Sequence, residues 1–211
     1  MLRRQPGENF DAGIINGPRG KGSVVAVDDH QLRLAFTWGE TPPAPSPLVL
    51  VVGLPRPQTA RDILRDATAL GVAAMHFVRT EKGEASYGQS SLWQSQEWAD
   101  CLVTGAAQAF CTRLPEVTHG RGFAEVISSL GPGQTRLSLD NYEASAALAE
   151  ACLPAAPVVL ALGGERGWSD AERALLRQHG FALAHLGPRV LRTETACIAA
   201  IALIKAKCGW L

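Results

Sequence analysis

The 211-residue chain lacks the features that would mark a membrane or secreted protein. No apolar run reaches the ~18 residues that a membrane-spanning helix needs. The two arginines at its start are followed by a polar Gln-Pro-Gly segment, where a secretory signal would carry an apolar stretch. These absences predict a cytoplasmic protein with no membrane contact.

Cysteine is sparse, and its spacing excludes two common uses. The five cysteines are an odd number, contain no C-x-x-C pair, and do not group with histidines as zinc ligands would. We therefore expect free thiols in a reducing compartment and no bound metal.

Net charge is also lacking, because 20 basic residues balance 20 acidic ones. A nucleic-acid-binding protein usually carries a basic excess, so any contact with RNA would need a local patch. The chain has no P-loop, G-x-G-x-x-G or G-x-S-x-G motif. Nucleoside triphosphate binding, dinucleotide binding and serine hydrolysis therefore lose support.

A proline-rich segment divides the chain. Residues 41–47 hold four prolines in seven positions, a composition typical of an extended linker. Before it, residues 1–40 contain three short β-like runs, at 9–16, 23–27 and 31–37, with a predicted hairpin turn at 28–30. Three strands make too thin a core to fold alone, so this part is expected to lean on the rest of the protein or on a second subunit.

Residues 48–211 alternate between strand and helix patterns. We expect strands at 48–54, 72–78, 135–139, 158–162 and 181–186, and helices at 59–70, 92–109, 123–130, 142–152, 170–179 and 193–207. Thr59 is a predicted helix cap, Ser169 and Glu172 fit a capping box, and Gly180 fits a helix stop. The pattern predicts an α/β fold, a mostly parallel sheet covered by helices.

Three loops in the second half of the chain follow predicted strands. They are Leu139-Asp140-Asn141, the glycine-bearing run Leu162–Trp168, and the run Leu186–Ala196, which holds two arginines and a glutamate. In open α/β sheets, ligands bind at the carboxyl ends of strands. Glycines let a backbone approach a ligand closely. The loops therefore predict one small-molecule pocket.

The two glycine-bearing runs, Gly163-Gly164-Glu165-Arg166-Gly167-Trp168-Ser169 and Leu186-Gly187-Pro188-Arg189-Val190-Leu191-Arg192-Thr193-Glu194-Thr195-Ala196, together closely resemble the RsmE family of bacterial 16S rRNA uridine-N3 methyltransferases. Weaker matches reach upstream, such as Ala67–Val72. The resemblance implies a SPOUT fold with a C-terminal trefoil knot, a shortened PUA-like RNA-binding domain, S-adenosyl-L-methionine as cofactor, and a homodimer acting on small-subunit rRNA.

The resemblance also implies roles for individual residues. Arg192 and Glu194 are the expected catalytic pair, with Glu194 as proton acceptor and Arg192 as a stabiliser of charge on the uracil carbonyls or a grip on a phosphate. The alternative is that the two form an ion pair fixing the last helix, with Thr193 as its cap. Cofactor contacts are expected from Leu139, Leu162, Gly163, Gly164, Glu165, Gly167, Leu186, Gly187, Leu191, Arg192 and Thr193, and RNA contacts from Arg3, Arg4, Arg113 and Arg189.

The sequence departs from the family pattern at several positions. Gly164 and Arg166 replace the proline and the first glycine of the family's GPEGG, and Arg166 would be strained if that position needs positive φ. Other departures are Ala69, Ala107 and Cys111. Trp168 is expected to pack beneath the first loop, and His185 to be a core or edge histidine. Two further functions stay open: a SPOUT methyltransferase acting on another RNA, and a non-catalytic paralogue that binds RNA or cofactor.

Overall fold

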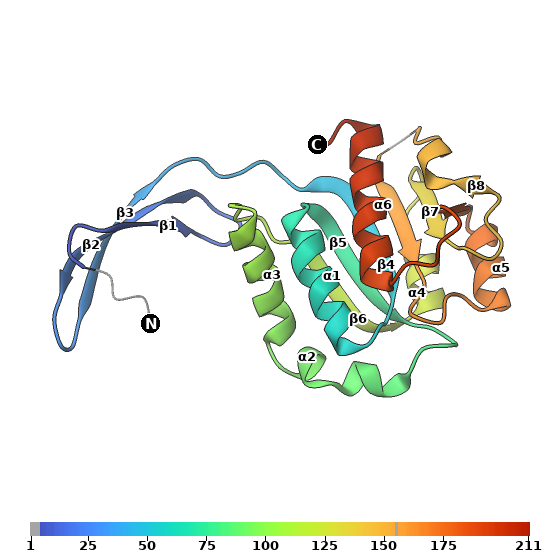
Figure 1. Ribbon diagram of the computed structural model, residues 1–211, viewed down its shortest axis with the longest axis horizontal. Coiled ribbons are helices and arrows are strands. Elements are labelled where there is room, and N and C mark those ends of the chain that lie inside the picture. The colour runs from blue at the N-terminus through green and yellow to red at the C-terminus, as the bar shows by residue number, and fades with distance from the viewer. Residues whose placement is uncertain (1–4, 155) are drawn as a thin grey trace.

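The computed structural model describes residues 5–154 and 156–211, and it divides into two β-sheets (Figure 1). A three-stranded antiparallel sheet, β1-β2-β3, extends away from the rest of the molecule. Its strands are β1 (Asn9–Gly13), β2 (Arg19–Val27) and β3 (Leu32–Trp38). The expected hairpin turn is present, because one Asp28 carboxylate oxygen accepts the backbone N–H groups of His30 and Gln31, each at 2.8 Å.

The N-terminal sheet buries little. Val24 is 3% exposed, but Phe36 and Trp38 stay 45% and 41% exposed. Residues 39–45, which precede β4, form neither helix nor strand, where the sequence predicts a linker. The division into domains at residues 40 and 48 stays a prediction.

The second sheet has seven strands in the order β6-β5-β4-β9-β7-β10-β8, and their pairings are parallel. Its strands are β4 (Ser46–Gly53), β5 (Val72–Arg79), β6 (Glu116–Gly122), β7 (Thr135–Leu139), β8 (Ala146–Ala147), β9 (Val158–Leu162) and β10 (Ala182–His185). The helices are α1 (Pro57–Ala69), α2 (Ser91–Gln94), α3 (Glu97–Gln108), α4 (Phe123–Ser129), α5 (Asp170–Gln178) and α6 (Thr193–Cys208), with short 3-10 turns at Ala85–Gln89 and Leu148–Glu150. The predicted α/β class is confirmed.

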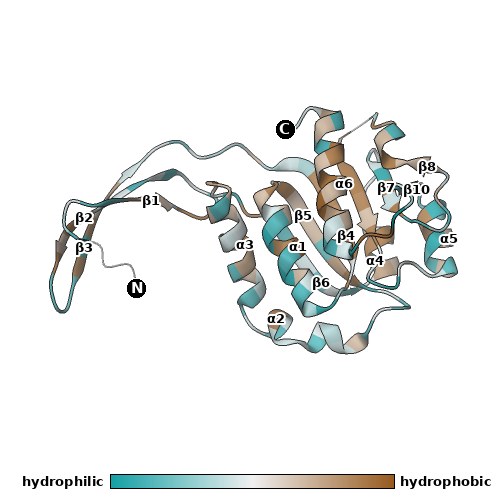
Figure 2. Ribbon diagram, viewed as in Figure 1, coloured by the Kyte–Doolittle hydropathy of each residue, from teal (hydrophilic) through white to brown (hydrophobic). Residues whose placement is uncertain are grey.

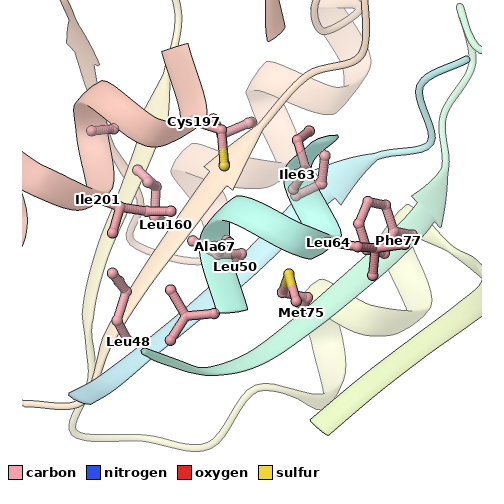
Figure 3. Packing of buried hydrophobic residues seen from close by; sticks show 14 of the residues in the cluster. Leu48, Leu50, Ile63, Leu64, Ala67, Met75, Phe77, Leu160, Cys197 and Ile201 are labelled. Atoms are coloured by element: carbon pink, nitrogen blue, oxygen red, sulfur yellow. The ribbon is translucent and has the colours of Figure 1, made fainter. Parts of the chain in front are cut away.

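Helices cover both faces of this sheet. On one face, Ile63 and Leu64 of α1 and Ile201 of α6 pack with Leu50 and Leu160 of the central strands (Figure 3). On the other face, the buried side chains of α4 and α5 pack with alternate residues of the same strands. The central strands are apolar on both sides (Figure 2), as expected of a sheet buried between two layers. None of the described helices has the length and apolar character needed to cross a membrane.

Strand β10 lies between β7 and β8, although the chain reaches it after both. The segment therefore enters the sheet between two strands that were already connected to each other. From β10 the chain continues into α6, which packs against α1. The trefoil knot that the resemblance implies stays a prediction.

Three local predictions are wrong, and one strand is missing from the prediction. No helix covers residues 142–152, because the Asp140 carboxylate binds the N–H groups of Tyr142 and Glu143 and the chain then pairs alongside β10. The helix expected at 92–109 is split into α2 and α3. Helix α1 begins at Pro57, so Thr59 is not its cap. Strand β6 was not expected. The capping box is confirmed: Glu172 N donates to Ser169 Oγ at 3.1 Å, and Ser169 N donates to Glu172 Oε2 at 2.8 Å.

Candidate cofactor site

The three loops predicted to share a pocket line one cavity. Because β9, β7 and β10 are neighbours in the sheet, their carboxyl ends lie side by side. The cavity is lined by residues 139–142, 162–167, 184–187 and 189–191, together with Thr193 and Ala196. Three separate regions of the chain thus form one site, because a parallel sheet brings the following loops to the same edge.

All the residues expected to bind the cofactor line this cavity, with the exception of Arg192. Arg192 is the residue before α6 and is exposed. Glu194 lies in the first turn of α6, half-buried, next to the cavity-lining Thr193 but outside the lining itself. The catalytic roles of Arg192 and Glu194 stay predictions. The structure shows that both residues adjoin Thr193, which lines the cavity.

The predicted RNA contacts are scattered. Arg189 lines the cavity. Arg113 lies far from it and donates from Nε to the Pro42 carbonyl at 2.9 Å and from Nη1 to the Asn16 carbonyl at 3.1 Å, which ties the N-terminal sheet to the α/β part. Arg3 and Arg4 lie outside the described residues. Of the two predicted arginines that the structure describes, Arg189 therefore lines the cavity and Arg113 does not.

The first glycine loop closes tightly on itself. Gly167 adopts a φ of +63° and donates its N–H to the Gly164 carbonyl at 2.9 Å. A Cβ on Gly163 would lie 2.8 Å from Gly167 Cα, so the loop has no room for a side chain there. The left-handed residue is Gly167, and Arg166 has an ordinary φ. The strain considered for Arg166 is therefore absent.

Two contacts fix this loop on the protein. Glu165 Oε1 accepts the backbone N–H of Arg56 at 2.9 Å and its Nε at 3.3 Å. Trp168 is buried beneath the loop and donates from Nε1 to Ser138 Oγ at 3.0 Å and to the Leu139 carbonyl at 3.2 Å. The expected packing of Trp168 is confirmed, and its ring nitrogen also links two walls of the cavity.

The second glycine loop turns at Gly187, whose φ is +101°. Its N–H donates to His185 Nδ1 at 3.0 Å, so this ring nitrogen is the acceptor. His185 is half-buried at the end of β10 and lines the cavity. Its ring is hydrogen-bonded, as expected, but β10 is an inner strand of the sheet, so His185 is not an edge histidine. Its ring also shapes the second wall.

The alternative role considered for Arg192, Thr193 and Glu194 is not supported. Among residues 5–154 and 156–211, no salt bridge joins Arg192 to Glu194. The residue in the cap position is Arg192, and no side chain caps the helix there. Thr193 is therefore the first residue of α6 and is not its cap. Glu194 has no ion-pair or hydrogen-bond partner for its side chain within the same described residues.

No sequence pattern singles out the buried ion pair that supports the loop after β7. Asp140 and Arg173 are buried, and Arg173 Nε donates to Asp140 Oδ2 at 2.7 Å. Burial acts to raise the pKa of Asp140, but hydrogen bonds from Glu143 N–H, Arg173 and Tyr142 N–H outweigh it, so the pKa is lowered. Arg173 lies one residue after the capping-box Glu172, and only the fold shows that it reaches Asp140.

The cavity has the chemistry of an organic-ligand site. Leucines from all three loops line it, and Gly163, Gly164 and Gly167 add backbone without side chains to the lining. Such a lining suits a flat, largely apolar organic group held by main-chain hydrogen bonds. Over the described part of the chain, no group of His, Cys, Asp and Glu side chains could hold a metal ion.

Known proteins resemble this chain over most of its length. A model of the RNA methyltransferase domain matches residues 42–205. The chain is 37% identical over 212 residues to ribosomal RNA small subunit methyltransferase E of Treponema pallidum, covering 98% of this chain and 80% of that protein. The protein of the same name from Synechocystis is 30% identical over 213 residues, covering 98% of this chain and 68% of that protein.

A solved structure shows the same fold. The crystal structure of a ribosomal RNA small subunit methyltransferase E from Neisseria gonorrhoeae bound to S-adenosyl methionine superimposes with a TM-score of 0.84. The two sequences are 23% identical, and the match covers 98% of this chain and 86% of that one.

Proposed function

The chain belongs to the ribosomal RNA small subunit methyltransferase E family, and we propose that it transfers a methyl group from S-adenosylmethionine to N3 of a uridine in 16S rRNA. The observation that carries the proposal is the single cavity formed by the loops after β7, β9 and β10. These loops hold the residues that resemble the family, and a relative of the same fold binds S-adenosyl methionine.

The cofactor would supply an electrophilic methyl group carried on a sulfonium. The chain's contribution would then be positioning, with the leucines and the glycine backbone of the cavity holding the adenosine part. Gly163 allows the first loop to close around the ligand, and Glu165 keeps that loop in place through Arg56.

The uridine must lose its N3 proton as the new bond forms. Glu194 is the one carboxylate of the run Leu186–Ala196. Its side chain has no partner in the part of the chain that the structure describes, so it is available to accept the proton. Arg192, exposed at the start of α6, would stabilise negative charge on the uracil carbonyls. These two residues are the proposed catalytic pair.

We propose that the enzyme works as a homodimer in the cytoplasm. Val190 and Leu191 are 80% and 38% exposed at the edge of the cavity, a position that a second subunit would cover. Light scattering at several concentrations tests this. A monomer at all concentrations would contradict the dimer and leave the methyltransferase proposal standing.

The decisive experiment is to map methylated nucleotides in 16S rRNA from a strain lacking this protein. Loss of one N3-methyluridine, restored by the purified protein with S-adenosylmethionine, is the expected result. Methyl transfer only to another RNA would favour the alternative of a SPOUT methyltransferase with a different RNA target. Calorimetry that detects no S-adenosylmethionine binding would favour the non-catalytic paralogue.

A further inference from the structure

An aromatic ring is held, but not covered, at the mouth of the cofactor cavity. Tyr142 lines the cavity and is 75% exposed. Its backbone N–H donates to Asp140 Oδ1 at 2.8 Å, and the buried Arg173 in turn holds Asp140. The Arg173 guanidinium lies 5.4 Å from the centre of the Tyr142 ring. The ring is therefore fixed in place at its base while most of its surface faces solvent.

The ring also lies beside the first glycine loop. A Cβ on Gly167 would be 3.9 Å from Tyr142 Cε2, which puts the ring at van der Waals distance from that position. The loops after β7 and β9 thus meet at this tyrosine. A fixed and exposed aromatic side chain offers a flat surface, and proteins use such surfaces to stack unpaired nucleobases.

Two arginines from the neighbouring loops line the same cavity as this ring. Arg166 belongs to the loop after β9 and Arg189 to the loop after β10, while Tyr142 follows β7, the strand between these two. Both arginines are exposed. Across the described residues, neither side chain forms a salt bridge or hydrogen bond. The neighbouring Glu165 is already paired with Arg56, so it does not neutralise Arg166.

This arrangement supplies the local basic patch that a chain with zero net charge needs in order to bind RNA. We propose that Tyr142 stacks on a base of the substrate RNA while Arg166 and Arg189 bind phosphates on either side of it. The inference rests on the proposed function for the RNA class of substrate. It assigns a role to Arg166, which stands where the family pattern has a glycine.

The test measures binding of a labelled, uridine-containing single-stranded RNA oligonucleotide by fluorescence anisotropy over a range of salt concentrations. Tyr142→Ala should weaken binding about tenfold, whereas Tyr142→Phe, which keeps the ring, should bind normally. Arg166→Gln and Arg189→Gln should each lower the slope of log K against log salt by about 0.7, and Arg166→Lys should keep the slope. Arg121→Gln is the control. Arg121 lies on the edge strand β6, does not line the cavity, and pairs with Glu125 of α4.

Calorimetry with S-adenosylmethionine and light scattering are run on the same variants. Unchanged cofactor affinity and oligomeric state, with weakened RNA binding, support the proposal. Three results would overturn it: unchanged RNA binding in Tyr142→Ala and the arginine variants, an equal loss of cofactor affinity in Tyr142→Ala, or dissociation of a dimer by that variant. If the wild type binds the RNA as expected but methylates no 16S rRNA, the proposed function fails and this binding site stands.

Discussion

Arg173 and Asp140 form an ion pair inside the protein, with side chains 5% and 2% exposed and Nε 2.7 Å from Oδ2. Arg173 belongs to α5, which follows the first glycine loop, and Asp140 begins the loop after β7. The pair therefore fixes two walls of the cofactor cavity relative to each other. Arg177, one turn further along α5, pairs with Glu143 of the same loop, but its side chain is 49% exposed.

Removing one partner of the buried pair should destabilise the protein strongly. Arg173→Ala leaves the Asp140 carboxylate buried without its charge partner, and we expect the free energy of unfolding to fall by about 3–5 kcal/mol. Arg177→Ala removes an exposed pair and should cost no more than about 1 kcal/mol. Urea unfolding followed by circular dichroism measures both. Equal losses of unfolding free energy in the two variants would show that burial does not make the Arg173–Asp140 pair more important than the exposed pair.

The Asp140 carboxylate should make stability depend on pH in acid. Its pKa is lowered in the folded protein, so its contribution is fully present above its unfolded pKa of about 3.9 and is lost as the pH falls through the folded value. The difference in unfolding free energy between the wild type and Asp140→Asn should be constant near neutral pH and shrink below about pH 4. A difference that stays constant into strong acid would show that Asp140 does not titrate in this way.

The first glycine loop offers a matched pair of substitutions. Gly163→Ala would place a Cβ 2.8 Å from Gly167 Cα, whereas on Gly164 the nearest atom is the Gly53 carbonyl oxygen at 3.4 Å. We expect Gly163→Ala to lower the affinity for S-adenosylmethionine about tenfold or more, since overpacking of this kind costs about 1–3 kcal/mol. Gly164→Ala should bind nearly as the wild type does. Calorimetry measures both affinities. A weaker affinity in Gly164→Ala than in Gly163→Ala would mean that the loop changes its conformation when it binds the cofactor.

Glu194→Ala should separate binding from chemistry. We expect cofactor affinity to be kept and turnover to fall by about 100-fold, the usual scale for losing an acid–base group. Thr195→Ala, at the exposed next position of α6, is the control and should keep its turnover. Single-turnover transfer of labelled methyl groups to 16S rRNA measures both variants. Near-normal turnover in Glu194→Ala would leave Glu194 without a catalytic role.

Local signals predicted much of the α/β part. Ser169 and Glu172 specify the start of α5 through their own side chains, and an apolar run such as Val158–Leu162 can only be a buried strand. The sequence pattern of residues 142–152 predicts a helix, but contacts with residues outside this segment override that pattern. Asp140 captures the first two N–H groups after Asn141, and the edge of β10 offers backbone partners to Ala146 and Ala147.

The sequence by itself determined the alternation of strands and helices, the two glycine loops, and the family they resemble, because these depend on residues close together in the chain. Only the tertiary structure decided that Arg173 reaches Asp140, that Trp168 bonds to Ser138, and that Tyr142 lines one cavity with Arg166 and Arg189. The order β9-β7-β10 creates these relationships by placing strands that are distant in sequence side by side. No local pattern encodes that order, since it depends on how the whole sheet is assembled.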